Sequence, residues 1–170
     1  MKALYLVGFM GSGKTTVGAE LARRLNVPVV DTDHYIEQQT GRTINDIFAE
    51  EGEEKFRLFE TAVLEQLPTN DIIITTGGGL FMKEENRRWM KEGGTVIYLH
   101  CDFKEIWARL QDDHTRPLLH HQNFEKAKAL YEWRQPFYEQ ADITIHTTGK
   151  QVDHVCEEIL SLIKDEAPRT

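Results

Sequence analysis

Five short apolar runs recur along the chain and alternate with stretches of helical periodicity. The runs fall at residues 3–7, 27–30, 72–76, 95–99 and 143–145, each of a length suited to a buried strand. The stretches between them repeat apolar side chains at three- and four-residue spacing, as amphipathic helices do. Strands that alternate with helices predict an α/β domain built on a five-stranded parallel sheet, with helices on both faces.

The helices follow from this spacing and from capping signals. They are predicted over residues 15–25, 34–39, 43–50, 53–67, 103–110, 125–138 and 152–163. Thr43 is the expected N-cap of the third helix, and the sixth is expected to be interrupted near Pro136. We find no repeat, low-complexity tract or long linker, so a single domain over residues 1–170 is predicted.

The first strand leads into a loop of unusual composition. Residues 8–15 read GFMGSGKT, which fits the phosphate-binding pattern G-x-x-x-x-G-K-[ST] between a strand and a helix. Glycines let backbone N–H groups wrap phosphate oxygens, and the helix N-terminus adds partial positive charge. Lys14 is expected to reach the β- and γ-phosphates of ATP, and the Thr15 hydroxyl to hold Mg²⁺. The predicted ATP-binding residues of the loop are Gly11, Ser12, Gly13, Lys14, Thr15 and Thr16.

Ligands of a parallel sheet bind at the carboxyl ends of its strands. Here those ends carry the phosphate loop, the pair Asp31 and Asp33, three glycines at 77–79, and His100. With two carboxylates so close at a strand end, one could hold a magnesium-bound water while the other meets an acceptor hydroxyl. A structural alternative is that Asp33 caps the helix that begins at His34.

Missing motifs narrow the class of triphosphate enzyme. A GTPase would need N-K-x-D and D-x-x-G, and the chain contains neither. A motor ATPase would need a strand ending in Asp-Glu, whereas the third strand ends in Thr75, Thr76 and glycines. A small-molecule kinase remains, which requires a carboxylate for the metal, a base for the acceptor hydroxyl and a lid bearing arginine.

Composition restricts the partners and the compartment. A net charge of −8 argues against nucleic acid, and no apolar segment approaches the length of a membrane span. No signal peptide is expected. Cys101 and Cys156 form no C-x-x-C pair, which favours reduced thiols and a cytoplasmic protein. A monomer is expected, although no exposed apolar stripe stands out from which the oligomeric state could be read.

Taken together, the motifs resemble the shikimate kinase family, whose members use ATP to phosphorylate the 3-hydroxyl of shikimate in aromatic amino acid biosynthesis. The matching segments are the phosphate loop, Asp31-Thr32-Asp33, Phe56-Arg57-x-x-Glu60, Gly77-Gly78-Gly79, Arg116-Pro117-Leu118-Leu119, and Arg134 with Pro136 and Tyr138. The resemblance extends from residue 2 to about residue 160. It implies a P-loop kinase fold with a mobile lid at about 110–124 and an acceptor-binding helical region at about 33–62.

For the acceptor, the resemblance implies four residues. Asp33 would hydrogen-bond the hydroxyls and serve as base or orienting carboxylate. Arg57 and Arg134 would clamp the shikimate carboxylate, because a planar guanidinium matches a planar carboxylate in a way that lysine does not. Gly78 would offer its backbone N–H at close range, which requires the absence of a side chain.

For the nucleotide, it implies a second set. Asp31 would lie near Mg²⁺ together with Thr15, and Arg116 on the lid would close over the phosphates and stabilise charge during transfer. Arg109 is a candidate to stack on adenine, bordered by residues 148–151. Catalysis would thus rest on Asp33, Lys14 and Arg116.

Several alternatives remain open at this level. Arg57 lies four residues after Glu53 and three before Glu60, so it could belong to a solvated helix ion pair. Arg134 could equally lie on the surface. A sister kinase for gluconate or a nucleoside monophosphate, or a nucleotide sensor without catalysis, would share the phosphate loop. The acidic stretch at Asp112 and Asp113 is unexpected where phosphates arrive.

Overall fold

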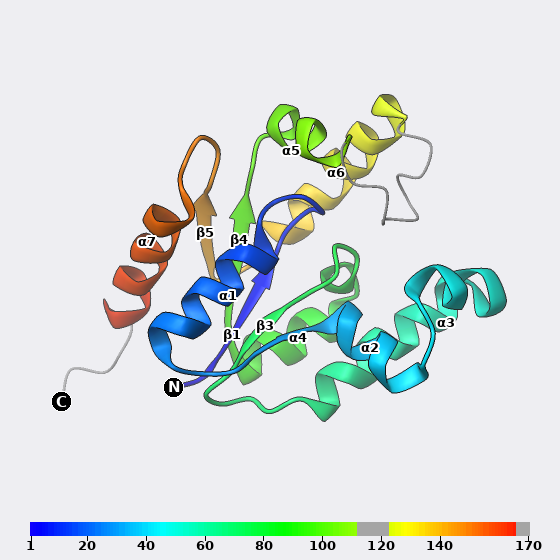
Figure 1. Ribbon diagram of the computed structural model, residues 1–170, viewed down its shortest axis with the longest axis horizontal. Coiled ribbons are helices and arrows are strands. Elements are labelled where there is room, and N and C mark those ends of the chain that lie inside the picture. Colours follow the sequence, from blue (N-terminus) through cyan, green and yellow to red (C-terminus); the bar gives the residue numbers. More distant parts are fainter. Residues whose placement is uncertain (112–122, 166–170) are drawn as a thin grey trace.

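The computed structural model describes residues 1–111 and 123–165 of the chain (Figure 1). Strands and helices alternate along it, as the apolar pattern predicts. The strands are β1 (Ala3–Val7), β2 (Val29–Asp31), β3 (Ile73–Thr75), β4 (Gly94–His100) and β5 (Ile143–His146). The helices are α1 (Lys14–Leu25), α2 (Thr32–Thr40), α3 (Ile44–Gln66), α4 (Glu84–Gly93), α5 (Phe103–Leu110), α6 (Phe124–Tyr138) and α7 (Val152–Asp165), with a 3₁₀ turn η1 (Leu80–Met82).

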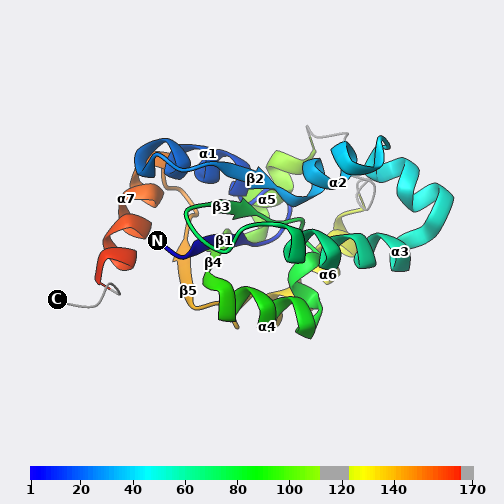
Figure 2. The same ribbon diagram turned by 90° about the horizontal axis from the view of Figure 1, so that it is seen from below.

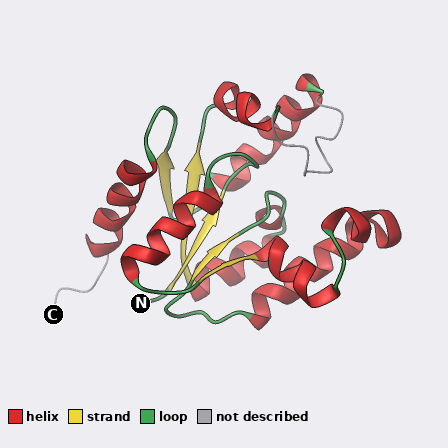
Figure 3. Ribbon diagram, viewed as in Figure 1, coloured by secondary structure: helices red, strands yellow, loops and turns green. Residues whose placement is uncertain are grey.

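The five strands form one sheet in the order β2-β3-β1-β4-β5. Every neighbouring pair is parallel, so all carboxyl ends lie at the same edge (Figure 3). The central strand β1 is flanked by β3 and β4, and the register pairs Tyr5 with Ile74 on one side and Val96 on the other. The predicted five-stranded parallel sheet is therefore confirmed, and the phosphate loop leaves its middle strand.

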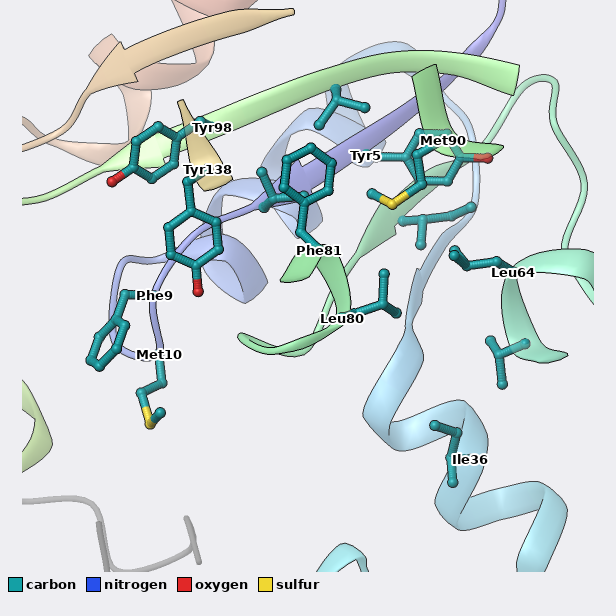
Figure 4. Packing of buried hydrophobic residues seen from close by; sticks show 14 of the residues in the cluster. Tyr5, Phe9, Met10, Ile36, Leu64, Leu80, Phe81, Met90, Tyr98 and Tyr138 are labelled. Atoms are coloured by element: carbon teal, nitrogen blue, oxygen red, sulfur yellow. The ribbon is translucent and has the colours of Figure 1, made fainter. Parts of the chain in front are cut away.

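Helices cover both faces of the sheet, as predicted (Figure 2). Alternate side chains of β1 divide between the two layers: Leu4 and Leu6 pack in the apolar cluster that includes α1 and α7 residues. Tyr5 and Val7 belong to the opposite cluster, which the helices α3, α4 and α6 complete (Figure 4). Because both faces are buried, the strands read as continuous apolar runs rather than as alternating ones.

Some boundaries differ from the prediction. The second strand begins at Val29 rather than at residue 27, and it extends to Asp31. The two helices expected over 43–50 and 53–67 adjoin as α3, with a kink at Gly52, whose φ of 84° and ψ of 170° are not helical. Thr43 is the N-cap as expected, and it accepts a hydrogen bond from the Asp46 N–H at 3.1 Å.

Two features of the helices were not anticipated. Helix α4 was not predicted, although its buried residues Asn86 and Met90 have the four-residue spacing of a helix face. The expected interruption near Pro136 was wrong, because α6 continues through it to Tyr138. Pro136 lies near the C-terminal end of α6, so its missing N–H removes one helical hydrogen bond but does not terminate the helix.

Candidate active site

A cavity of about 870 Å³ lies where the carboxyl ends of β1, β2 and β3 meet the helices α2 and α3. Each predicted site residue that the structure describes lines it: Gly11, Ser12, Gly13, Lys14, Thr15, Thr16, Asp31, Asp33, Arg57, Gly78, Arg109 and Arg134. Arg116 and most of the predicted lid at 110–124 fall outside the described residues. His100 does not line this cavity; it contacts His146, Tyr131 and Gln135 instead.

The phosphate loop has the backbone that its glycines predict. Gly11 and Gly13 adopt positive φ values of 80° and 96°, which a side chain would strain. At Gly8, a Cβ atom would stand 2.8 Å from the carbonyl oxygen of Leu99. The Lys14 ammonium is buried and donates to the carbonyls of Gly8, at 2.7 Å, and Phe9, at 3.0 Å. These two hydrogen bonds hold the lysine ammonium group against the phosphate loop, which would enclose a bound phosphate.

The two aspartates occupy different elements. Asp31 ends β2 and caps α2, because its Oδ1 accepts from the His34 N–H at 3.0 Å. The Thr75 hydroxyl donates to the other Asp31 oxygen at 2.9 Å. The helix cap is therefore Asp31, and the proposal that Asp33 caps the helix was wrong. Asp33 lies in the first turn of α2 and faces the cavity.

The glycine turn after β3 is the point on which the acceptor-side residues converge. A Cβ atom on Gly77 would lie 2.7 Å from Asp33 Oδ1, and one on Gly78 would lie 2.9 Å from Arg134 Nη1. One on Gly79 would lie 2.5 Å from the Arg57 guanidinium. The turn lacks side chains because three charged groups already occupy the space that they would fill.

The two arginines have different surroundings. Arg57 pairs with Glu53 at 3.0 Å and with Glu60 at 2.7 Å, so the expected helix ion pairs exist, yet its guanidinium also lines the cavity. Arg134 is only 3% exposed, and a surface position for it is excluded. Within the described part of the chain, its Nε and Nη1 have no hydrogen-bond partner, although they are buried. Buried guanidinium donors of this kind are costly unless a ligand satisfies them.

Glu60 is a site residue to which sequence reasoning assigned only an ion-pair role. Its carboxyl is fully buried and lines the cavity, and Oε2 has no hydrogen-bond partner among the residues described. Burial raises the pKa of Glu60 to about 7, although the neighbouring Arg57 acts in the opposite direction. Its position on the buried face of α3, between Phe56 and Val63, was the available signal.

At the opposite end of the cavity, Arg109 supports the phosphate loop. Its Nη1 donates to the carbonyl of Gly11 at 2.8 Å, and Nη2 lies 3.5 Å from Glu105 on the same helix. Thr147 and Lys150, from the segment between β5 and α7, line the cavity beside it. The adenine contacts expected of Arg109 and residues 148–151 stay a prediction.

The site combines a phosphate loop on the central strand with two aspartates after the second strand and two arginines that line the same cavity. This combination defines a P-loop kinase of small molecules. The shikimate kinase family model matches residues 10–164 of this chain. A shikimate kinase of Bacillus cytotoxicus is 53% identical over 163 residues, which cover 96% of this chain and 99% of that protein.

Solved structures agree with the sequence comparison. Shikimate kinase from Acinetobacter baumannii, solved in complex with shikimate, has a TM-score of 0.94 and 39% identity, covering 99% of this chain and 96% of that one. Shikimate kinase from Aquifex aeolicus has a TM-score of 0.83 and 37% identity, covering 97% and 98%.

The chain belongs to the shikimate kinase family. It is an ATP-dependent phosphotransferase that phosphorylates shikimate in aromatic biosynthesis, as the resemblance implied. No helix within residues 1–111 and 123–165 is long and apolar enough to cross a membrane.

Proposed function

We propose that this cavity transfers the γ-phosphate of ATP to the 3-hydroxyl of shikimate, giving shikimate 3-phosphate and ADP. One observation carries the proposal. Asp33, Arg57 and Arg134 converge on the glycine turn in the same cavity that the phosphate loop lines. A carboxylate-bearing polyol and a triphosphate held there would place a hydroxyl against the terminal phosphate.

Arg57 and Arg134 hold the acceptor carboxylate in this proposal. The buried Arg134 Nε and Nη1 donors support this role, since a carboxylate would satisfy them. Arg57 is held from behind by Glu53 and Glu60, and its guanidinium keeps a fixed orientation toward the cavity. A gluconate kinase would also need cationic groups for a carboxylate, so the acceptor has to be tested directly.

Asp33 carries out the proton transfer. As the acceptor oxygen forms its bond to the γ-phosphorus, the Asp33 carboxylate accepts the hydroxyl proton. The bond from the γ-phosphorus to the bridging oxygen breaks, and its electron pair leaves with ADP. Lys14 offsets the charge that develops on the phosphate oxygens, and we assign the same role to Arg116, which lies outside the described residues.

The donor set at the phosphate loop suits Mg²⁺, which takes oxygen ligands and usually retains several waters. Thr15 supplies a hydroxyl and Asp31 a carboxylate. Each Asp31 oxygen already accepts one hydrogen bond and keeps a further lone pair for a metal-bound water. When bound with the phosphates, Mg²⁺ would neutralise part of their charge.

We also propose a monomeric, cytoplasmic protein. The most exposed large apolar side chains among the described residues stand on separate helices, Leu58 on α3 and Trp133 on α6. Both cysteines are buried and unpaired, which suits a reducing compartment.

The test is ADP release from Mg-ATP with shikimate, gluconate, AMP or no acceptor, with the product phosphate located by ³¹P–¹H correlation. Turnover confined to shikimate, with phosphate on the 3-oxygen, supports the proposal. Phosphate on another shikimate oxygen would mean that shikimate binds in a different orientation relative to Asp33. Turnover with another acceptor instead of shikimate would mean that Arg57 and Arg134 bind that acceptor.

A further inference from the structure

Tyr138, the last residue of α6, is a buried residue that no step above uses. It is 1% exposed and does not line the cavity. Its ring stacks on that of Tyr98 from β4, with centroids 5.1 Å apart and planes at 26°. In Figure 4 the Tyr138 hydroxyl is directed away from Tyr98, toward Phe9 and Met10.

The Tyr138 hydroxyl reaches the acceptor side of the site. It donates a hydrogen bond of 2.5 Å to the carbonyl of Gly78. A Cβ atom placed on Gly78 would have Arg134 Nη1 at 2.9 Å and the Tyr138 oxygen at 3.6 Å. Burial raises the pKa of Tyr138 to about 12, so the phenol keeps the proton that it donates. Tyr138, Arg134 and Gly78 therefore meet at one point.

Holding a carbonyl also fixes the amide on the far side of the same peptide. The described chain has no cis peptide bond, and in a planar trans peptide the C=O and the following N–H point in opposite directions. Because the Gly78 carbonyl points to Tyr138, in the core, the Gly79 N–H points to the cavity side. That N–H donates no hydrogen bond to any described residue.

We propose that Tyr138 is a positioning residue for the acceptor. Its hydroxyl fixes the Gly78–Gly79 peptide, so that the Gly79 N–H faces a shikimate oxygen, and it holds the Arg134 guanidinium against the same turn. The inference rests on the proposed acceptor site, and it adds to that site a donor, Gly79, and the residue that orients it.

Tyr131 offers a matched control. It is also a buried tyrosine of α6, and its hydroxyl donates to a main-chain carbonyl, that of Cys101, at 2.8 Å. It does not line the cavity. Tyr138→Phe and Tyr131→Phe therefore lose the same kind of hydrogen bond, and only the first loses it at the glycine turn.

The experiment measures KM for shikimate and for ATP, kcat and the thermal midpoint of both variants. We expect the midpoints to fall similarly, because each variant loses one buried hydrogen bond. Tyr138→Phe should raise KM for shikimate roughly tenfold and leave KM for ATP within about twofold, whereas Tyr131→Phe changes neither. Equal shikimate KM values in the two variants, or a parallel rise in KM for ATP, would overturn the proposal.

A second measurement uses the wild-type chain and needs no variant to fold. A glycine-selective ¹⁵N spectrum of its 12 glycines should show the Gly79 amide shifting when shikimate is added. An unmoved Gly79 amide would refute its role as a donor. Arg134→Lys separates the two proposals. If its KM for shikimate is unchanged, the proposed acceptor site itself is wrong. If its KM for shikimate rises while that of Tyr138→Phe stays at the wild-type value, the acceptor site stands and only the role of Tyr138 is refuted.

Discussion

Replacing Glu60 by glutamine should change how the stability of the protein depends on pH. The carboxyl is buried within the site, and its pKa rises from 4.5 to about 7 on folding. Below pH 4.5 the group is protonated in both the folded and the unfolded chain, and it imposes no penalty. As pH rises from 4.5 to 7, the unfolded chain releases the proton first, so the free energy of unfolding falls. Above about pH 7 the loss is complete.

The size of this effect follows from the two pKa values. Each pKa unit corresponds to about 1.4 kcal/mol, so the charged carboxylate lowers the free energy of unfolding by about 3 kcal/mol between pH 4.5 and 8. Glutamine has no proton to release and should remove this component. The difference between the unfolding free energies of wild type and Glu60→Gln should therefore change by about 3 kcal/mol across the window.

Urea denaturation at pH 5, 6, 7 and 8, without ligands, measures this difference. At a slope of roughly 2 kcal/mol per molar urea, 3 kcal/mol moves the midpoint by about 1.5 M. Glu53→Gln is the matched control, because it removes the exposed carboxylate from the same arginine. The urea midpoint of Glu53→Gln should change with pH by the same amount as that of wild type. If the midpoint of Glu60→Gln also changed with pH as that of wild type does, burial would not raise the pKa of Glu60 and the reasoning would be wrong.

Three further substitutions test the site. Asp33→Asn should abolish turnover while ATP affinity, measured by calorimetry, stays within a few-fold; near-normal kcat would remove Asp33 from the proton transfer. Arg134→Ala should raise KM for shikimate by tenfold or more, because a charge-assisted pair contributes roughly 1.5–3 kcal/mol, and steady-state kinetics with an unchanged KM would exclude the clamp. Gly79→Ala should keep the fold, since φ at this residue is −94°, but its methyl group would displace the Arg57 guanidinium now 2.5 Å from that position. The KM of Gly79→Ala for shikimate should rise while its thermal midpoint stays at the wild-type value. A lowered midpoint with an unchanged KM would indicate that the glycine has only a structural role.

Local patterns predicted much of the candidate site. The phosphate loop depends on residues adjacent in sequence, so its glycines and Lys14 could be assigned from spacing alone. The sheet followed from short apolar runs, because strands covered on both faces are apolar throughout. Helix α4 was missed because only two of its residues, Asn86 and Met90, are buried, which leaves a weak apolar pattern.

What the sequence by itself determined is the chemistry available: a phosphate loop after the first strand, a pair of aspartates after the second and a side-chain-free turn after the third. Only the tertiary structure decided which groups meet. It made Asp31 the helix cap and left Asp33 to the cavity, because α2 begins directly after the strand. It also brought Tyr138 to Gly78 across 60 residues of chain. Burial and contact between distant segments depend on how helices pack on the sheet, and spacing along the chain carries no record of that packing.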